Sequence, residues 1–290
     1  MNLKSGRNKF MYVITIAVLL IVFIVIFFQI PYSKTKSVFH RLMKTKISEI
    51  TSEHGSITEE DMKHLPAPVQ RYFRYCGYIG LPKMTYMKAT FKNVDFYMIK
   101  GGKKSKLKID YTQYNFIKKP ERFALIDSSM YGIPFEGFDS YQKGIGSMKG
   151  VLAKLITLFD QRGEAMDKAC LVTFLSECLI VPSAALQDYI TWEEIDDTHA
   201  KAVITCYGLS AEGIFTFNEK GEMLSFRTKD RTSTDMDGTQ REAEWSAILS
   251  DYRLVNGLRC PNVLQAVWHY PEGDFLYFDG NNVKIEYNRK

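Results

Sequence analysis

Hydrophobic residues are most concentrated in one uninterrupted run near the N-terminus. Residues 11–30 are almost wholly apolar, and no charged side chain occurs between Phe10 and Ser33. Twenty residues in a helix, at about 1.5 Å each, span the roughly 30 Å hydrocarbon core of a bilayer. The sequence therefore predicts a basic N-terminal tail over 1–10 and a transmembrane helix over 11–30. A cleaved signal peptide is the alternative, although its apolar region would be only about 7–15 residues long.

The pattern becomes a weak helical one after the apolar run. Residues 31–58 begin with many Lys and Arg, and apolar side chains recur at spacings of three and four, as in Val38, Phe39, Leu42 and Met43. A basic amphipathic segment next to a span is typical of a helix that lies close to anionic lipid headgroups. We therefore expect residues 31–58 to form a basic juxtamembrane stalk.

Two further helices are predicted in the rest of the chain. Over residues 67–76 the apolar side chains fall at positions i, i+3, i+4 and i+7, and Gly77 provides a stop. Over residues 163–181 the chain is apolar on nearly all sides, and Pro182 ends the run. A helix without a dominant polar face is a buried helix. This second helix is too short and too polar to be another membrane span.

Most of the remaining chain alternates between apolar and polar residues, which is the period of a β-strand. The alternation begins near residue 83 and resumes after the 163–181 helix, with turns such as Asn256-Gly257 between strands. Short turns between sequential strands favour an antiparallel meander. No linker-like segment or repeat divides the chain after residue 59. We predict one domain over 59–290, of the α+β class and mainly β. It would be a large, curved, half-barrel-like antiparallel sheet with a buried plug helix, preceded by the N-terminal transmembrane helix.

The net charge of +5 belongs to the membrane end of the chain. The first 46 residues hold eight Lys and Arg and no Asp or Glu, so the remainder is slightly acidic. The body therefore lacks a basic footprint, and we expect no nucleic-acid partner. Basic residues flank the apolar run on both sides, so their count alone does not decide orientation. Because a long domain translocates largely regardless of charge, whereas a short cationic tail resists translocation, we expect a single-pass membrane protein with an extracytoplasmic body.

Motifs for cofactor and metal binding are missing or incomplete. Gly144 and Gly146 form a GxG pattern, but the third glycine and the following helix of a nucleotide-binding loop are missing. The five His residues are scattered, and Cys170 and Cys178 lie about 12 Å apart along a helix, too far to share a zinc ion. The five cysteines have no CxxC spacing and are expected to be reduced, mostly buried thiols. We expect no cofactor and no metal.

Glu177 is the first candidate for chemistry in the body. It lies in the predicted buried helix, and a buried carboxylate must be paired or its pKa rises. Arg227, on a predicted strand, is the partner that we expect. The pair is either a structural ion pair or part of a ligand-binding or catalytic site. Four carboxylates between Trp192 and Asp197 are a second candidate, either as a solvated turn or as an acid–base site.

Aromatic and Met residues are frequent in the predicted strands, where most of them would fill the core. A sheet of this size with one helix inside it also leaves room for an apolar cavity. We expect such a cavity to hold a lipid or another apolar small molecule. The candidate ligand contacts are Tyr141, Met148, Glu177, Trp192, Arg227 and Trp268.

Several short motifs, taken in order along the chain, resemble one bacterial family. They are LPAPVQRY (65–72), DSY and GIGSM (139–148), RGEAMD (162–167), FLSE and PSAAL (174–186), WEEIDD (192–197) and PEGDF (271–275). The family is an uncharacterised one, family 6544, and the resemblance covers about residues 60–290. It implies membrane association but no established activity. The predicted architecture is also similar to half-barrel periplasmic lipoprotein carriers, which is an analogy of fold and not of function.

Three functions remain open at this point. The first is a membrane-anchored extracytoplasmic binding module that holds a lipid or other apolar ligand between sheet and helix. The second is an enzyme of unrecognised class that uses carboxylates such as Glu177 or Asp196. The third is a structural protein of the cell envelope. A lined cavity would favour the first, and convergent polar groups in a cleft would favour the second.

Overall fold

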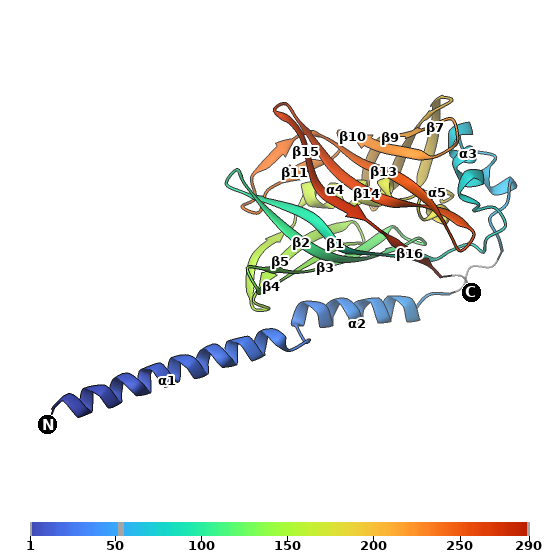
Figure 1. The fold of residues 1–290 in the computed structure, drawn as a ribbon. Helices are drawn as coiled ribbons and strands as arrows, with labels where there is room; N and C mark the ends of the chain where they lie inside the picture. Colours follow the sequence, from blue (N-terminus) through green and yellow to red (C-terminus); the bar gives the residue numbers. More distant parts are fainter. Residues whose placement is uncertain (1, 52–54, 289–290) are drawn as a thin grey trace.

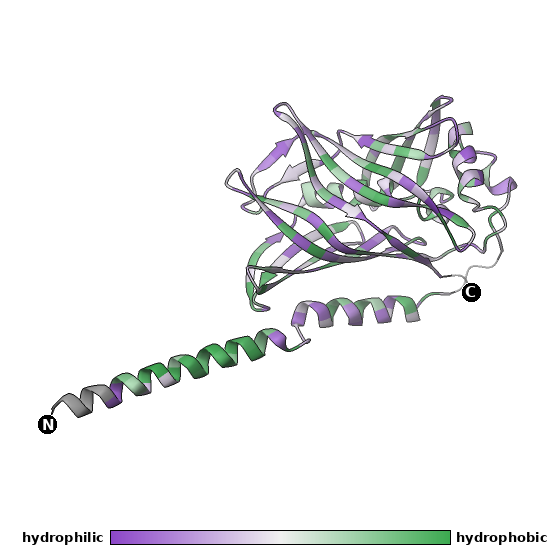
Figure 2. Ribbon diagram, in the orientation of Figure 1, coloured by the Kyte–Doolittle hydropathy of each residue, from purple (hydrophilic) through white to green (hydrophobic). Residues whose placement is uncertain are grey.

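A long helix stands apart from the body at the N-terminal end of the protein (Figure 1). The computed structural model describes residues 2–51 and 55–288, with side chains from residue 8 onward. Parts of the predicted tail (1–10) and stalk (31–58) therefore lie outside the described residues. Helix α1 spans Asn2–Gln29 and is hydrophobic along most of its length (Figure 2). The large apolar side chains between Phe10 and Ile26 are exposed. The helical region that contains them is long and apolar enough to cross a membrane, a criterion that an N-terminal signal sequence also meets.

One antiparallel sheet of fourteen strands forms most of the body. In chain order its strands are β1 (Tyr86–Lys100), β2 (Lys103–Phe116), β3 (Glu121–Met130), β4 (Ile133–Gln142), β5 (Ile145–Leu152), β6 (Ile156–Gln161), β7 (Ile190–Asp196), β8 (His199–Cys206), β9 (Leu209–Phe217), β10 (Met223–Thr228), β13 (Glu244–Val255), β14 (Leu258–Tyr270), β15 (Gly273–Asn281) and β16 (Lys284–Tyr287). A separate hairpin consists of β11 (Thr232–Thr234) and β12 (Gln240–Glu242).

The order of the strands follows the chain in three runs. It is β6-β5-β4-β3-β2-β1-β15-β14-β13-β10-β9-β8-β7, and β16 also pairs with β1. Strands that follow each other in the chain therefore mostly lie side by side, as the short turns predict. The last long strand, β15, returns to pair with β1 and joins the first six strands to the rest. The predicted mainly β class and the large curved antiparallel sheet are confirmed.

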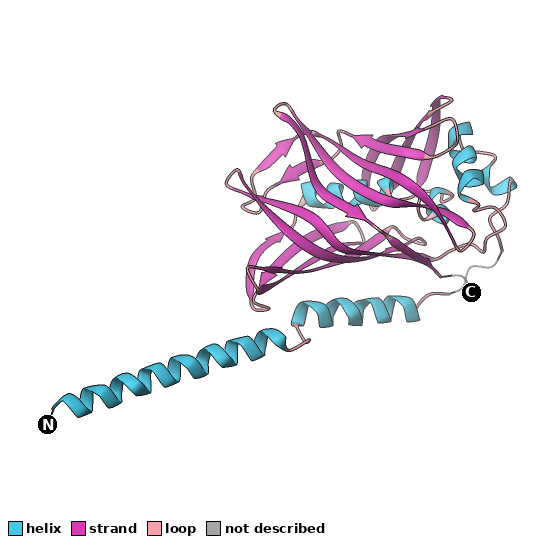
Figure 3. Cartoon of the chain, viewed as in Figure 1, coloured by secondary structure: helices cyan, strands magenta, loops and turns pink. Residues whose placement is uncertain are grey.

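The sheet coils around helix α4, which spans Glu164–Ser176 (Figure 3). This helix contacts β5 on one side and β9 on the other, and seven of its residues are buried. The predicted helix over 163–181 is too long, because regular α-helix ends at Ser176. From there the backbone continues in tight turns, in which Glu177 N–H donates to Phe174 O and Cys178 N–H to Leu175 O. A short helix, α5, follows at Pro182–Ala185.

Helix α2, over Lys34–Ser48, lies on the outer face of the sheet instead of standing free as a stalk. Its buried residues Phe39 and Met43 pack against side chains of β2 and β3, including Phe123. Two ion pairs flank this contact, Lys36 with Asp127 at 2.7 Å and Lys46 with Glu121 at 2.6 Å. The helix begins at Ser33, whose hydroxyl accepts a hydrogen bond from Lys36 N–H. The segment that follows α1 is therefore part of the packed body.

Two smaller helices cover another part of the sheet. A 3₁₀ turn at Glu60–Met62 is followed by α3 at Ala67–Cys76. The apolar face of α3 is fully buried, with Tyr72 and Phe73 at its centre, and the helix contacts β14 and β8. It ends at Gly77, which adopts the left-handed conformation (φ 79°) that favours glycine.

Helix α1 is also attached to the body directly. The turn between β5 and β6 carries Lys154, whose ammonium group donates to three carbonyl oxygens at the C-terminal end of α1. These are Phe27 O at 2.9 Å, Phe28 O at 3.2 Å and Ile30 O at 2.6 Å. A cation is favourable at this position because the last carbonyls of a helix have no partner within the helix.

We predict that Phe39→Ala releases α2 from the sheet. Phe39 is 1% exposed, and truncating a buried Phe to Ala costs about 3–5 kcal/mol. Hydrogen–deuterium exchange should show fast exchange over residues 34–48, with little change in β13 and β14. Lys44→Ala, on the exposed face of the same helix, is the matched control and should retain protection. Equal protection in both variants would show that the packing of Phe39 does not hold the helix.

Candidate ligand-binding site

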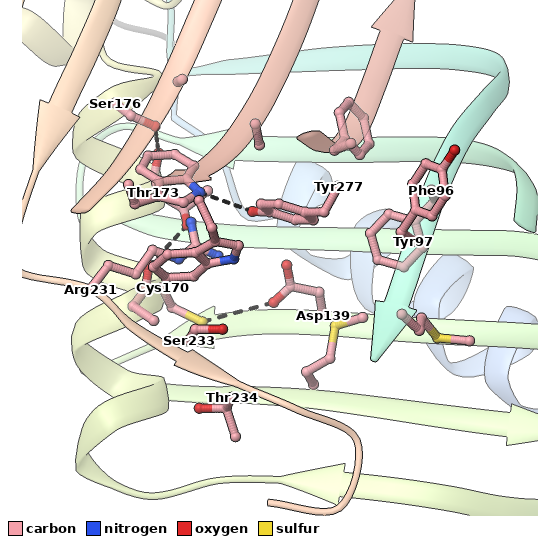
Figure 4. Close-up of a pocket in the computed structure, with 18 of the residues that line it drawn as sticks. Phe96, Tyr97, Asp139, Cys170, Thr173, Ser176, Arg231, Ser233, Thr234 and Tyr277 are labelled. Carbon is pink, nitrogen blue, oxygen red and sulfur yellow. Dashed lines mark hydrogen bonds between the residues drawn. The ribbon is translucent and has the colours of Figure 1, made fainter. Parts of the chain in front are cut away.

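A cavity of about 260 Å³ lies between the concave face of the sheet and α4. It is partly open, and aromatic and sulfur-containing side chains contribute a large part of its wall (Figure 4). The wall includes Phe96, Tyr97, Met148, Met166, Trp245 and Trp268. Its volume exceeds the roughly 150 Å³ of an engineered apolar cavity that binds benzene, and lies near the lower end of ligand pockets at roughly 300–1,000 Å³. The space therefore suits a small molecule or a single acyl chain.

The apolar wall follows from the alternation of the strands. On β13 the side chains of Trp245, Ala247 and Leu249 point inward, and on β14 those of Trp268 and Tyr270 do. Trp268 and Tyr270 stack with ring centroids 6.2 Å apart. The indole N–H of Trp245 donates to the hydroxyl group of Tyr277 on β15, at 3.1 Å. The large rings thus face the cavity, and the indole N–H of Trp245 already has a hydrogen-bond partner.

One part of the wall is polar and centred on Arg122 of β3. Its guanidinium group contacts Asp139 Oδ2 at 2.6 Å, Glu177 Oε2 at 3.0 Å and the Tyr111 hydroxyl at 2.6 Å. Glu177 Oε2 also accepts a hydrogen bond from the Asn115 side chain at 2.7 Å. Burial opposes the charge of Arg122, but Glu177, Tyr111 and Asp139 outweigh it and hold the pKa of the guanidinium well above its usual value. The cluster connects β2, β3 and β4 to the end of α4.

The partner of Glu177 is therefore Arg122, and the prediction that Glu177 pairs with Arg227 is wrong. Phe226 points into the core, so its neighbour Arg227 points outward from β10. There Arg227 pairs with Glu244 at 2.8 Å, with more than half of its side chain exposed.

Arg231 is a second cation in the cavity wall, and it differs from Arg122. Its guanidinium carbon lies 4.4 Å from the ring centroid of Trp245 and 5.6 Å from that of Trp268. One nitrogen donates to Thr173 Oγ1 at 2.9 Å, whereas the buried Nε has no hydrogen-bond partner. Among the residues that the structure describes, no carboxylate lies within ion-pair distance of Arg231. The cavity therefore contains a positive charge held mainly by aromatic rings.

Three of the six predicted ligand contacts line the cavity, and three do not. Met148, Glu177 and Trp268 are in its wall. The other three are Tyr141, Trp192 and Arg227. Tyr141 is fully buried elsewhere, and Trp192 packs on Phe215 with its N–H bonded to Ala185 O at 3.0 Å.

Five residues that were not among the predicted ligand contacts also line the cavity: Arg122, Asp139, Arg231, Trp245 and Tyr277. A signal for Arg122 was present, because it shares the inward alternation of β3 with Ala124 and Ile126.

The profile of one protein family matches residues 55–280, which is most of the chain. The chain belongs to the family of unknown function DUF6544. A comparison with curated proteins finds no match. The family assignment therefore supplies no activity for this DUF6544 protein, and its chemistry has to be judged from its own residues.

Three solved structures share a distant likeness of fold with this DUF6544 chain. An outer membrane lipoprotein-sorting protein domain from Vibrio parahaemolyticus is 10% identical, with a TM-score of 0.37, over 71% of this chain and 84% of that one. A DUF1329 family protein from Desulfovibrio piger is 12% identical, with a TM-score of 0.32, over 77% and 94%. A LolA superfamily protein from Nitrosomonas europaea is 10% identical, with a TM-score of 0.39, over 74% and 92%. At these scores the likenesses carry no functional weight.

Neither Asp196 nor Cys170 of this DUF6544 chain has the surroundings of an activated group. Asp196 is the exposed last residue of β7, where the backbone N–H of Thr198 and the side chain of His199 lower its pKa to about 2. Burial raises the pKa of the Cys170 thiol in the cavity wall, which disfavours the nucleophilic thiolate. Among the described residues, no group of three or more His, Cys, Asp or Glu is placed to hold a metal ion.

A Ser–His–Asp line lies on the outer face of the same sheet. The Ser246 hydroxyl is hydrogen bonded to His269 Nε2, and His269 Nδ1 lies 2.7 Å from Asp274 Oδ1. These residue types form the triad of many hydrolases. However, Ser246 is 1% exposed and is paired in register on both sides, with Arg227 and Val267. Ser246 is therefore enclosed within the sheet, and its hydroxyl group is not accessible to a substrate.

We predict that Arg122→Met destabilises the protein strongly, because it leaves two carboxylates in the cavity wall without their cation. Breaking a buried ion pair by removing one partner costs about 3–5 kcal/mol. The matched control is Arg227→Met, which breaks an exposed pair worth about 0–1 kcal/mol. Urea unfolding followed by circular dichroism would measure both. A cost for Arg122→Met no larger than for Arg227→Met would contradict the structural role of the cluster.

Proposed function

We propose that this protein is a membrane-anchored binding module that holds a ligand with an apolar chain in the cavity beneath α4. The observation that carries the proposal is the cavity itself, with its aromatic and Met wall between sheet and helix. Moving the apolar surface of a ligand from water into such a space lowers the free energy of the system, which favours binding. The exposed apolar surface of α1 supports the membrane anchor, because such a surface is stable only in a bilayer.

The polar end of the ligand would lie beside Arg231. Its guanidinium group borders the cavity and has no carboxylate partner among the described residues, so an acidic group of a ligand can pair with it. Arg122 does not offer this, since Glu177 and Asp139 already neutralise it. The ligand class that fits is an amphiphile with one apolar chain and a carboxylate or phosphate head.

The membrane setting of the proposal has two parts. Helix α1 would remain in the bilayer as a single span, and the body would lie on the extracytoplasmic side. The second part is supported by the sequence alone, because the short N-terminal segment is cationic and resists translocation. A reporter fused to the C-terminus would test the extracytoplasmic location of the body. Activity of a reporter that works only in the cytoplasm would contradict that location.

We predict that the full chain in detergent binds dodecanoic acid more tightly than dodecanol. Native mass spectrometry with equal amounts of the two probes would measure the ratio bound. Arg231→Met should weaken binding of the acid about tenfold, as expected for losing an interaction of about 1.4 kcal/mol, and leave the alcohol unchanged. Arg227→Met removes the same charge from the outer face and is the matched control.

The outcomes separate the two parts of this prediction. If neither probe binds, the proposal of an apolar ligand is contradicted. If both probes bind equally to the native protein, only the proposal of an acidic head group is contradicted.

We also predict that Ala169→Phe blocks binding of both probes. Ala169 lies on α4 and lines the cavity, so a ring at this position occupies the ligand space. The unfolding midpoint of the variant should stay close to that of the native protein, because the added ring fills an existing space and does not have to displace packed atoms. Undiminished binding in a folded variant would place the ligand elsewhere.

A further inference from the structure

Two hairpin tips next to the end of α1 expose large apolar side chains. Tyr131, in the β3–β4 turn, is fully exposed, and Leu155 and Ile156, at the β5–β6 turn, are 75% and 57% exposed. We call these three residues the apolar tips. Exposure of one such residue is ordinary, but three on neighbouring turns indicate a surface that contacts something other than water.

The sheet places these tips at the same edge. In an antiparallel meander every second turn lies at the same end, which brings together the β1–β2, β3–β4 and β5–β6 turns. The backbone confirms that the last two are adjacent, because Ala153 N–H donates to Pro134 O at 2.7 Å. The β1–β2 turn adds positive charge at this edge, with Lys100 and Lys103 exposed.

The end of α1 lies at this edge as well. Lys154, immediately before Leu155, donates to the carbonyl oxygens of Phe27, Phe28 and Ile30. Its ammonium group also lies 5.2 Å from the centre of the Phe27 ring. If α1 spans a bilayer, its last turn lies where the hydrocarbon core meets the headgroups, and Leu155 lies at nearly the same depth.

We propose that the apolar tips insert into the headgroup layer of the bilayer that holds α1, and so form a second attachment of the body to the membrane. The proposal rests on α1 being the membrane anchor of the proposed function. The occupant of this edge is a lipid surface, because aromatic, aliphatic and Lys side chains together match the interface between hydrocarbon and headgroups.

This attachment also brings the cavity close to the bilayer. Ile99 lies one residue before the end of β1, beside the β1–β2 turn, and its carbonyl oxygen accepts a hydrogen bond from Met236 N–H at 2.9 Å. Both residues line the cavity. An amphiphile therefore has a short path between the lipid at this edge and the space beneath α4.

The test is a depth measurement on the full chain in vesicles of phosphatidylcholine and phosphatidylglycerol. A fluorescent NBD probe is attached at Leu155→Cys or at Ile145→Cys, after Cys206 and Cys260 have been changed to Ser. Ile145 is the matched control, because it is 61% exposed on a neighbouring strand end but lies by the β4–β5 turn, at the opposite edge. We expect the probe at 155 to emit at shorter wavelength, to be quenched by nitroxide lipids and to be protected from iodide, and the probe at 145 to show the reverse.

Two results would overturn the proposal, and they are distinguishable. If the chain stays with the vesicles through an alkaline wash but the probe at 155 is as accessible to iodide as that at 145, the tips do not touch lipid and the anchor stands. If the chain is released by the wash, α1 is not a membrane anchor, and both the anchor and the tip contact fail.

Discussion

The rest of the structure depends on the need to cover a helix that has no polar side. Seven residues of α4 are buried, and they face several directions, so strands have to surround the helix. A sheet that twists by roughly 20–25° per strand supplies this cover by coiling, with β5 and β9 on either side of the helix. Large rings from β13, β14 and β15 cannot pack completely against a slender helix of Ala, Cys and Thr at this point. The cavity is the space that remains.

The sequence was sufficient for those features that depend on local periodicity. Alternation predicted the strands, and the all-round apolar run predicted a helix inside the sheet. The contacts of the site required more, because the face on which a strand residue lies depends on register. The register between β14 and β15 shifts at Tyr277, so Tyr277 and its neighbour Phe278 both line the cavity, and a strict period of two cannot place the whole of β15. The pairing of Glu177 with Arg122 joins residues 55 positions apart, which no local pattern contains.

The docking of α2 shows a second limit of local patterns. Its apolar stripe is narrow, and its Lys residues suggested an anionic membrane as the partner. The structure instead provides acidic side chains of the sheet, Asp127 and Glu121, for two of those Lys residues. A basic helix thus fits either an anionic membrane or an acidic face of a sheet. Only the residues of β2 and β3, which are distant in the sequence, decide between the two. Local patterns could not predict the surroundings of Arg231 either, because Trp245 and Trp268 are brought next to it by folding.

The double attachment of α1 to the body, through Lys154 and through α2, determines how the protein can meet other molecules. A carrier that is free in solution searches a volume, whereas a body held by a packed helix of about 22 Å keeps one orientation relative to α1. If α1 is anchored in a membrane, as proposed above, the encounters of the body are confined to a plane and are set by lateral diffusion. A molecule that exchanged a ligand with it would then have to be attached to the same membrane, or to extend to the height of the body.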